Sequence, residues 1–402
     1  MDQQLLREPT RVGPDPPRVP ALSELDPAAR GRIDRLVGLS TRGLTAAYLP
    51  RTGGFARTVR GLPGGAGVRV VHEGTDLRYA AIAALGLGRL PVAAQREVVD
   101  GRTARDVAAL VVERADRTPD LGAVALAVWA ASEVYDELPH HLLTRLGAAV
   151  ASPAPIPALD LAWSLTAGVA AARFGDTEEL LATAAARLVR EQGVSGLWAH
   201  VLPARTQPRW RAHVGSFADQ VYPLQALARA ARLTGSTDLL AAAERTATRI
   251  CRLQGPAGQW WWHYDARDGG IVERYPVYSV HQHAMAPMAL LDLWEAGGSD
   301  HRAEVASGLA WLDHHPEVVE ELVSDRFGLV WRKVGRREPP KAARGIGALT
   351  TALRPGLHAP GIDTLLPPSV VDHECRPYEL GWLLYAWLPP RPDSRAGGAS
   401  DE

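Results

Sequence analysis

The chain lacks several features that would place it in one of the large classes of proteins. Its 402 residues include only two cysteines, Cys251 and Cys375, too few for a disulfide framework or a four-cysteine zinc site. The formal net charge is −1, so no overall field favours nucleic acid, and we predict no nucleic-acid partner. The longest apolar run, roughly residues 121–131, is shorter than the about 20 residues that a membrane span needs. We therefore predict no membrane span.

Signals for nucleotide binding and for targeting are also missing. The glycine-rich segment 61–67, GLPGGAG, lacks the lysine of a phosphate-binding loop, and the chain has no dinucleotide fingerprint. We accordingly predict no cofactor. The opening MDQQLLREPTRVGPDPP has no apolar core followed by a cleavage site, so we expect a cytoplasmic location.

Helical periodicity, in contrast, recurs along almost the whole chain. Apolar residues, mostly alanine and leucine, repeat with helical spacing in about a dozen segments. The clearest are residues 24–48, 75–90, 103–117, 119–135, 138–151, 157–174, 176–192, 217–234, 236–254, 281–297, 299–315, 338–353 and 374–388. The expected N-caps are Thr75, Asp176, Ser216, Ser236 and Ser299.

Little of the chain favours strands or disorder. Short strands are expected at residues 68–72, 271–278 and 329–333. Residues 1–20, with five prolines, are predicted to be a disordered arm, and residues 391–402 a disordered tail. Between them we expect one domain, residues 21–390.

An internal repeat gives more specific information. Residues 192–198, QGVSGLW, and residues 254–260, QGPAGQW, both fit Gln-x-x-x-Gly-x-Trp and lie 62 residues apart. Each follows a predicted helix, and each precedes a long loop and a helix with an early proline, Pro223 or Pro287. Glycine permits the conformation that ends a helix, glutamine can bond the freed backbone groups, and tryptophan can cover the joint. We therefore expect Trp198 and Trp260 to be buried at equivalent helix ends; residues 327–331, FGLVW, resemble a third copy without the glutamine.

This repeat resembles the glutamine–tryptophan motif of the terpenoid-cyclase and protein-prenyltransferase toroids. A glycine–tryptophan turn after an outer helix is also similar to the six-hairpin toroids of glycosidases, polysaccharide lyases and sugar epimerases. The resemblance covers about residues 175–300 well and the rest through its number of helices. It implies an all-α fold, an α/α toroid of about six helical hairpins.

In such a toroid, the loops that lead into the inner helices lie over one end of the barrel, so that end is the expected site. Three loops concentrate polar and aromatic residues: residues 198–219, residues 260–283 and residues 372–379. Asp219, His283 and His373 each stand four residues before an inner-helix proline. They could converge on one cavity, or they could cap the ends of helices.

Asp265 and Glu273 are the preferred general acid and base, because acid–base chemistry on sugars needs two carboxyls in different environments. Both could instead be loop charges, paired with Arg267 and Arg274. Glu374 and Glu379 are the alternative pair, and Asp219 and His283 complete the catalytic candidates. The residues expected to contact substrate, through stacking or through substrate carboxylates, are Trp260, Trp261, Trp262, His263, Tyr264, Arg274, Tyr278, His281, Gln282, Arg209, Trp210, Arg211, Arg376, Tyr378 and Glu379.

Two further groupings have more than one interpretation. The six cations from Arg332 to Arg344 could bind a carboxylate or diphosphate, or could form a solvated face. His281 and His283, with Asp372, His373 and Cys375, offer metal ligands. Protein prenyltransferases bind zinc through aspartate, cysteine and histidine, but their pattern does not match here residue by residue. We predict no metal.

The favoured function is a glycan-modifying enzyme: a hydrolase, lyase or epimerase acting on an oligosaccharide or other small molecule, with uronate-containing glycans among the candidates. A terpenoid-cyclase-like enzyme is the second hypothesis. Against it, the chain has neither an Asp-x-Asp-Asp cluster for protonating an alkene nor an Asp-Asp-x-x-Asp cluster for magnesium diphosphate. A non-catalytic toroid that binds a glycan or a protein is the third hypothesis. The sequence gives no oligomeric state.

Overall fold

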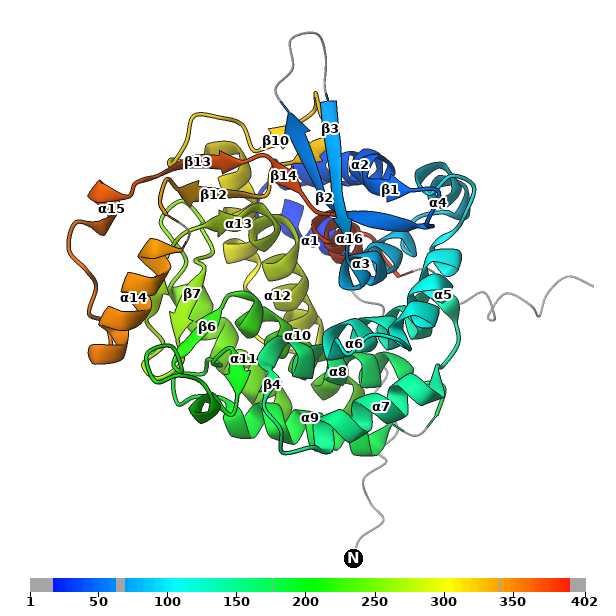
Figure 1. Ribbon diagram of the computed structural model, residues 1–402, viewed down its shortest axis with the longest axis horizontal. Helices are drawn as coiled ribbons and strands as arrows, with labels where there is room; N and C mark the ends of the chain where they lie inside the picture. Colours follow the sequence, from blue (N-terminus) through cyan, green and yellow to red (C-terminus); the bar gives the residue numbers. More distant parts are fainter. Residues whose placement is uncertain (1–16, 63–68, 176, 340, 391–402) are drawn as a thin grey trace, which may run out of the picture.

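Six helices form a closed inner ring in the computed structural model, which describes residues 17–62, 69–175, 177–339 and 341–390. Each of them packs against the next, and the last packs against the first (Figure 1). In chain order they are α3 (Leu77–Leu87), α6 (Leu121–Ala130), α8 (Ala158–Ala171), α10 (Ala218–Thr234), α12 (Ala286–Glu295) and α16 (Pro377–Trp387). π-Helical turns extend α6 at Ala131–Tyr135 and precede α12 at His281–Met285.

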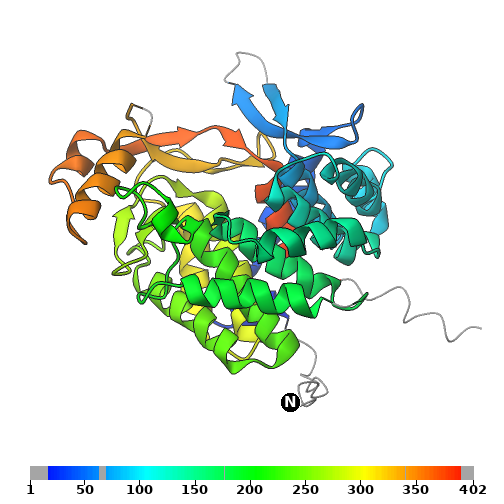
Figure 2. The same cartoon turned by 60° about the horizontal axis from the view of Figure 1, so that its bottom comes forward.

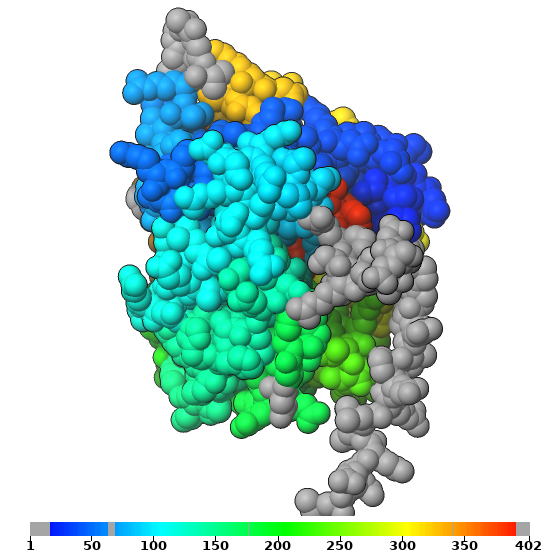
Figure 3. Space-filling model, turned by 90° about the vertical axis from the view of Figure 1, so that its right-hand side faces the viewer, coloured from blue at the N-terminus to red at the C-terminus, as the bar shows by residue number. Residues whose placement is uncertain are grey.

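Six more helices surround this ring and alternate with it along the chain. They are α2 (Ala29–Ala47), α5 (Ala104–Ala115), α7 (His140–Ala151), α9 (Glu178–Glu191), α11 (Thr237–Arg252) and α13 (Arg302–His314). The inner helices are apolar on nearly every side, as in α6, LGAVALAVWA, because neighbours surround them. The outer helices keep charged residues on their solvent faces. Figure 3 shows the segments of α5 and α7, in cyan and blue-green, packed together on one flank. The predicted α/α toroid is confirmed.

The remaining segments are short strands and helices inserted between the hairpins. The helices are α1 (Arg18–Ser23), α4 (Val92–Val98), α14 (Ala342–Leu353), α15 (Ile362–Leu365) and a 3₁₀ turn, Ala204–Thr206. The strands are β1 (Tyr48–Leu49), β2 (Gly54–Leu62), β3 (Arg69–Thr75), β4 (Ile156–Pro157), β5 (Val201–Leu202), β6 (Val214–Ser216), β7 (His263–Asp265), β8 (Ile271–Glu273), β9 (Val277–Tyr278), β10 (Val323–Ser324), β11 (Leu329–Val330), β12 (Lys333–Arg336), β13 (Pro368–Asp372) and β14 (Glu374–Cys375).

These strands form small antiparallel sheets that hold the long loops in place. β2 pairs with β3 and with β14, where Glu374 lies opposite Arg60. β12 pairs with β9 and β13, so Lys333 lies between Tyr278 and Asp372. β7 pairs with β6 and β8. In Figure 2 the strands β12 and β13 and the helices α14 and α15 extend along one side of the helical barrel.

The repeated turns have the structure that the sequence predicted. Trp198 and Trp260 are fully buried. Gln192 Nε2 donates to the carbonyl of Gly196 at 3.0 Å and to that of Ala242 at 2.9 Å; Gln254 Nε2 makes the same two bonds, to Gly258 and Glu304, at the same distances. The two turn glycines have φ of +86° and +94°, which a side chain would strain. The glutamine, glycine and tryptophan therefore fasten each outer helix to the next.

Several local predictions need correction. The arm expected over residues 1–20 includes residues of helix α1, and its residues 1–16 lie outside the described part of the chain, as does the tail, 391–402. Asp76, not Thr75, caps α3, whereas Ser236 caps α11 as predicted. His301, not Ser299, precedes α13, and Asp176 is not described. The predicted helix 338–353 exists as α14, but it lies outside the ring. Among the described residues, no helix is long and apolar enough to cross a membrane.

Candidate active site at the start of the inner helices

The first turns of the inner helices gather at one end of the barrel, because every inner helix runs in the same direction. One arginine connects three of these helices. Arg78, in the first turn of α3, binds Asp120, the N-cap of α6, through its Nε at 2.7 Å. Its Nη1 lies 2.9 Å from Asp160 Oδ1, in the first turn of α8. Two carboxylates therefore share one guanidinium at the mouth of the ring.

A glycine makes room for this arrangement. Gly122 lies in the first turn of α6, and a Cβ at that position would stand 2.3 Å from Asp160 Oδ1 and 2.6 Å from Arg78 Cζ. No side chain could occupy position 122 unless the aspartate and the arginine moved. The contact between α6 and the pair thus depends on glycine.

The two carboxylates differ in their surroundings, and so their pKa values move in opposite directions. Burial raises the pKa of Asp160, which is 8% exposed, and the attraction of Arg78 only partly offsets this effect. Burial also acts on Asp120, which is 37% exposed, but there the hydrogen bond and charge of Arg78 prevail and the pKa is lowered. Asp160 is thereby suited to hold a proton and Asp120 to stay ionised.

Aromatic rings lie beside this pair. Arg78 sits over the indole of Trp163, with its Cζ 5.3 Å from the ring centroid. Tyr222 of α10 meets Trp163 edge to face at 5.1 Å, and Tyr79 of α3 packs on Tyr378 of α16 at 4.6 Å. Rings from four inner helices therefore form an apolar surface next to the carboxylates, which suits a sugar ring.

A second acidic group follows along the same end of the barrel. Asp219, in the first turn of α10, is buried and accepts hydrogen bonds from Ser216 and from His200 Nδ1, the latter at 3.0 Å. Its hydrogen bond raises the pKa of His200, while its charge contributes to the raised pKa of Asp160. The predicted residue Asp219 therefore lies close to the Arg78 group.

Two arginines lie beyond His200. Arg344, from α14, sits over the ring of Trp262 at 5.1 Å. Burial and the nearby charge of Arg211 lower the pKa of Arg344. Neither Arg211 nor Arg344 pairs with a carboxylate in the described part of the chain. Such a pair of arginines is suited to bind an anionic group.

A third group surrounds the start of α16. Glu379 is buried and accepts a hydrogen bond from the backbone N–H of Arg376, while Arg332 Nε lies 3.5 Å from its Oε1. Burial raises the pKa of Glu379 to about 7, despite the opposing charges of Arg332 and Arg376. Glu374 binds Arg60 Nη2 at 2.6 Å. The structure thus brings together four predicted residues, Glu374, Arg376, Tyr378 and Glu379, the third of which packs on Tyr79 as described above.

The preferred pair, Asp265 and Glu273, is held differently. Asp265 is 1% exposed and binds the Arg267 guanidinium and backbone, at 2.7 Å and 2.9 Å. Glu273 is 5% exposed and binds Arg336 Nη2 and the Tyr275 N–H, both at 2.9 Å. Asp265 at the end of β7 and Glu273 at the end of β8 are thus each enclosed in a separate ion pair, with Arg267 and with Arg336 of β12.

Several other predicted contact residues belong to the packing of the core. Gln282 accepts from the N–H of Trp260 and donates to the carbonyl of Tyr278. Trp261 and Tyr264 are buried. His263, His281 and His283 are also buried, and burial lowers the pKa of each, to about 3 for His281 and His283.

The remaining predicted residues are more accessible. Trp262 is partly exposed and stacks on His263 at 3.9 Å, and Tyr278 lies beneath the Arg332 guanidinium at 5.0 Å. Arg209, Trp210 and Arg274 are exposed. Of these residues, Trp262 and Tyr278 lie nearest to the cations described above.

The sequence analysis missed Arg78, Asp120, Asp160 and His200. Two signals in the sequence could have revealed the two aspartates. Asp160 is the only charged residue in α8, ALDLAWSLTAGVAA, and a lone charge in an apolar helix needs a partner. Asp120 precedes the apolar α6 as an N-cap, in the position that Asp76 holds before α3.

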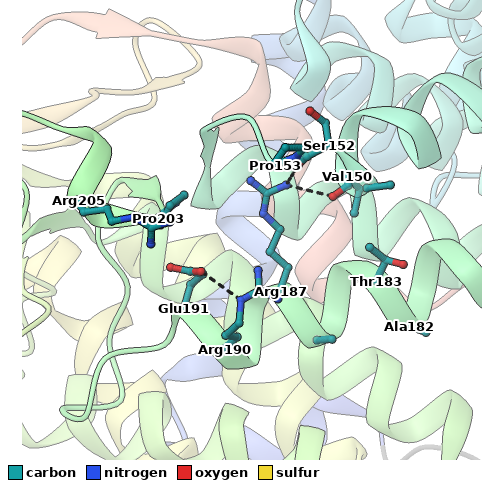
Figure 4. A pocket seen from close by; sticks show the side chains of 12 residues that line it. Val150, Ser152, Pro153, Ala182, Thr183, Arg187, Arg190, Glu191, Pro203 and Arg205 are labelled. Atoms are coloured by element: carbon teal, nitrogen blue, oxygen red, sulfur yellow. Dashed lines mark hydrogen bonds and ion pairs between the residues drawn. The ribbon is translucent and has the colours of Figure 1, made fainter.

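Two large hollows lie elsewhere on the molecule. One, of about 910 Å³, opens on the flank between α7 and α9 (Figure 4). Arg187 points into it and donates to the carbonyls of Val150 at 3.0 Å and Ser152 at 2.8 Å, so it caps the end of α7. The other, of about 660 Å³, lies at the opposite end of the ring, where Tyr385 and Arg229 stand at the ends of α16 and α10.

The architecture is that of a six-hairpin α/α toroid, the fold of several carbohydrate-processing enzymes. No family model matches the sequence, and no curated protein matches it. Solved structures do match. An unsaturated glucuronyl hydrolase specific for heparin aligns over 89% of this chain and 95% of its own, with 12% identity and a TM-score of 0.56. A single-residue variant of unsaturated glucuronyl hydrolase from Streptococcus agalactiae aligns over 89% and 90%, with 10% identity and a TM-score of 0.51. At such identity the likeness establishes the fold alone.

Proposed function

We propose that the protein is a glycoside hydrolase that acts on an anionic, uronate-containing oligosaccharide. The observation that carries the proposal is the Arg78 bridge, in which one guanidinium serves two aspartates whose pKa values move apart. Hydrolysis of a glycosidic bond needs such a division, because one carboxyl must give a proton while another stays ionised. The fold shared with the glucuronyl hydrolases supports the same class of reaction.

Asp160 is the proposed general acid. Its protonated carboxyl gives the proton to the glycosidic oxygen as the bond between carbon and oxygen breaks. Asp120, ionised beside Arg78, stabilises positive charge on the sugar, orients the water that adds to it and accepts the proton that this water loses. Tyr79 and Tyr378, which are both partly exposed, offer the apolar surface against which the sugar ring packs.

The proposed substrate is anionic because of Arg211 and Arg344. Both arginines are partly buried, Arg344 lies over the ring of Trp262, and neither pairs with a carboxylate among the described residues. A substrate carboxylate would satisfy them, and the indole ring would lie against the same sugar. This assignment keeps Arg211 and Trp262 in the binding roles that the sequence analysis expected. The terpenoid-cyclase hypothesis gains no comparable group, since the inner helices that the structure describes carry no cluster of closely spaced aspartates.

The test combines a substrate panel with one isosteric variant. Neutral and uronate-containing oligosaccharides are screened first by thermal shift and then by release of reducing ends. We expect uronate-containing members to bind and to be hydrolysed, and Asp160→Asn to bind them equally but turn over about 1,000-fold more slowly. Asp116→Asn, at an exposed carboxylate beyond the site, is the matched control and should keep full activity. Full activity of Asp160→Asn, or hydrolysis of neutral sugars alone, would contradict the proposal.

A further inference from the structure

A cysteine, a histidine and a glutamate come together where two outer helices of the toroid meet. Cys251 lies in the last turn of α11, His301 immediately precedes α13, and Glu304 lies in the first turn of α13. One ligand atom from each of the three lies within 4.8 Å of the other two. In the part of the chain that the structure describes, no other three such side chains meet so closely.

His301 lacks hydrogen-bond partners for its ring nitrogens. Both ring nitrogens of His301 are buried, and neither makes a hydrogen bond within the described residues. The nearest carboxylate oxygen, Glu304 Oε2, is 3.7 Å from Nδ1, beyond hydrogen-bonding distance. Buried polar atoms nearly always have a hydrogen-bond partner, so we expect the buried imidazole of His301 to bind a ligand.

The internal repeat provides a comparison within the same molecule. The junction between α11 and α13 is equivalent to the junction between α9 and α11, 62 residues earlier, because Gln254 and Gln192 make the same hydrogen bonds there. At the earlier junction, the positions of Cys251, His301 and Glu304 are occupied by Val189, Leu239 and Ala242. The turn therefore forms with apolar residues at all three positions. The polar trio is an addition to the second junction and is not required by its backbone.

From this arrangement we propose that Cys251, His301 and Glu304 form a binding site for a divalent transition metal, Zn²⁺ above all. Thiolate, imidazole and carboxylate together suit zinc, which takes four ligands in a tetrahedron. In such a tetrahedron neighbouring ligand atoms are about 3.5 Å apart, given bond lengths of about 2.0–2.3 Å. The observed separations need only small side-chain rotations to reach it, and water can fill the fourth position.

Binding requires one proton to leave. Burial, followed by the charges of Glu304 and Glu244, raises the pKa of the Cys251 thiol. Zn²⁺ displaces the thiol proton to solvent as the bond between sulfur and zinc forms, so affinity should rise with pH. A bound ion would link two neighbouring outer helices, α11 and α13. Because the trio lies among outer helices rather than at the proposed catalytic end, we expect the ion to have a structural role. The sequence analysis predicted no metal because its candidates, His281, His283, Asp372, His373 and Cys375, did not match a known zinc pattern residue by residue; the present trio joins the end of α11 to the start of α13.

The experiment uses the full chain, freed of metal by chelation and then titrated with Zn²⁺ or Co²⁺. The triple variant Cys251→Val, His301→Leu, Glu304→Ala copies the earlier junction and should therefore fold. Cys375→Ser is the control for the other thiol. We expect the wild type and Cys375→Ser to bind one ion with a dissociation constant below about 1 µM, and their Co²⁺ forms to show a thiolate charge-transfer band. Zn²⁺ should also raise the melting temperature of these two proteins.

The triple variant should lose the band, the stoichiometric ion and the Zn²⁺-dependent rise in melting temperature. Two results would overturn the proposal. One is a wild type that binds less than about one tenth of an equivalent at micromolar metal. The other is a triple variant whose circular dichroism matches the wild type and which binds Co²⁺ with the same spectrum. Neither result depends on any enzymatic activity.

Discussion

The chain places two pairs of carboxylates next to arginines, and the comparison between the pairs is instructive. Asp265 and Glu273 stand in the loop richest in polar and aromatic residues, yet each is enclosed by an arginine and by backbone N–H groups. Asp120 and Asp160 stand at the starts of apolar helices and share Arg78 at the mouth of the ring. The first pair stabilises a loop. The second places side by side two carboxylates whose pKa values move in opposite directions, as acid–base chemistry needs.

The largest effect on activity is expected from adding one methyl group at Gly122, beside the Asp120 and Asp160 pair. In Gly122→Ala, the new Cβ would meet Asp160 and Arg78 at distances that force both to move. A displacement of about 1 Å can cost about 100-fold in rate, so we expect kcat/KM to fall by about that factor. The melting temperature should fall as well, because the displaced Asp160 and Arg78 lose part of their ion pair, so activity is compared per folded molecule. Gly147→Ala is the control, since its Cβ would meet no atom within 4 Å. Equal activity in the two variants would show that the Arg78 arrangement does not matter.

A smaller and opposite effect is expected for the loop pair. Asp265→Asn removes a buried charge from its ion pair with Arg267, whose side chain is 41% exposed. Breaking a fully buried pair costs about 3–5 kcal/mol, and solvent around Arg267 reduces our expectation to about 2 kcal/mol. Denaturant unfolding measures the loss, with the exposed Asp268→Asn as the control. Activity per folded molecule should be unchanged. A stable but inactive Asp265→Asn variant would instead indicate that Asp265 is the general acid.

The fold was largely readable from the sequence, because the inner and outer helices follow the helical period of about 3.6 residues. The repeat added the turns, and the hydrogen bonds of Gln192 and Gln254 explain why those residues occur there. The small sheets were less readable. Lys333 pairs with Tyr278 on one side and Asp372 on the other, and Glu374 pairs with Arg60 from a distant part of the chain. Such short strands exist because of distant partners, which local patterns do not reveal.

The site was readable only in part. The start of α16 and Asp219 were placed at the barrel end correctly, because helix position alone brings those residues there. Asp120 and Asp160 were missed because the analysis searched for a high density of polar residues, whereas Asp160 stands alone in an apolar helix and Asp120 immediately precedes another. A polar residue isolated in an apolar helix carries more information here, since burial must be offset by a partner such as Arg78.

The account rests centrally on the different protonation of Asp120 and Asp160, which can be measured without any substrate. The side-chain carboxyl carbons of ¹³C-labelled aspartate are followed by NMR as a function of pH, and the Asp120→Asn and Asp160→Asn variants assign the two signals. We predict that Asp160 titrates above the usual aspartate pKa of about 3.8 and Asp120 below it. Signals that titrate together, or in the reverse order, would contradict the assignment of Asp160 as the acid.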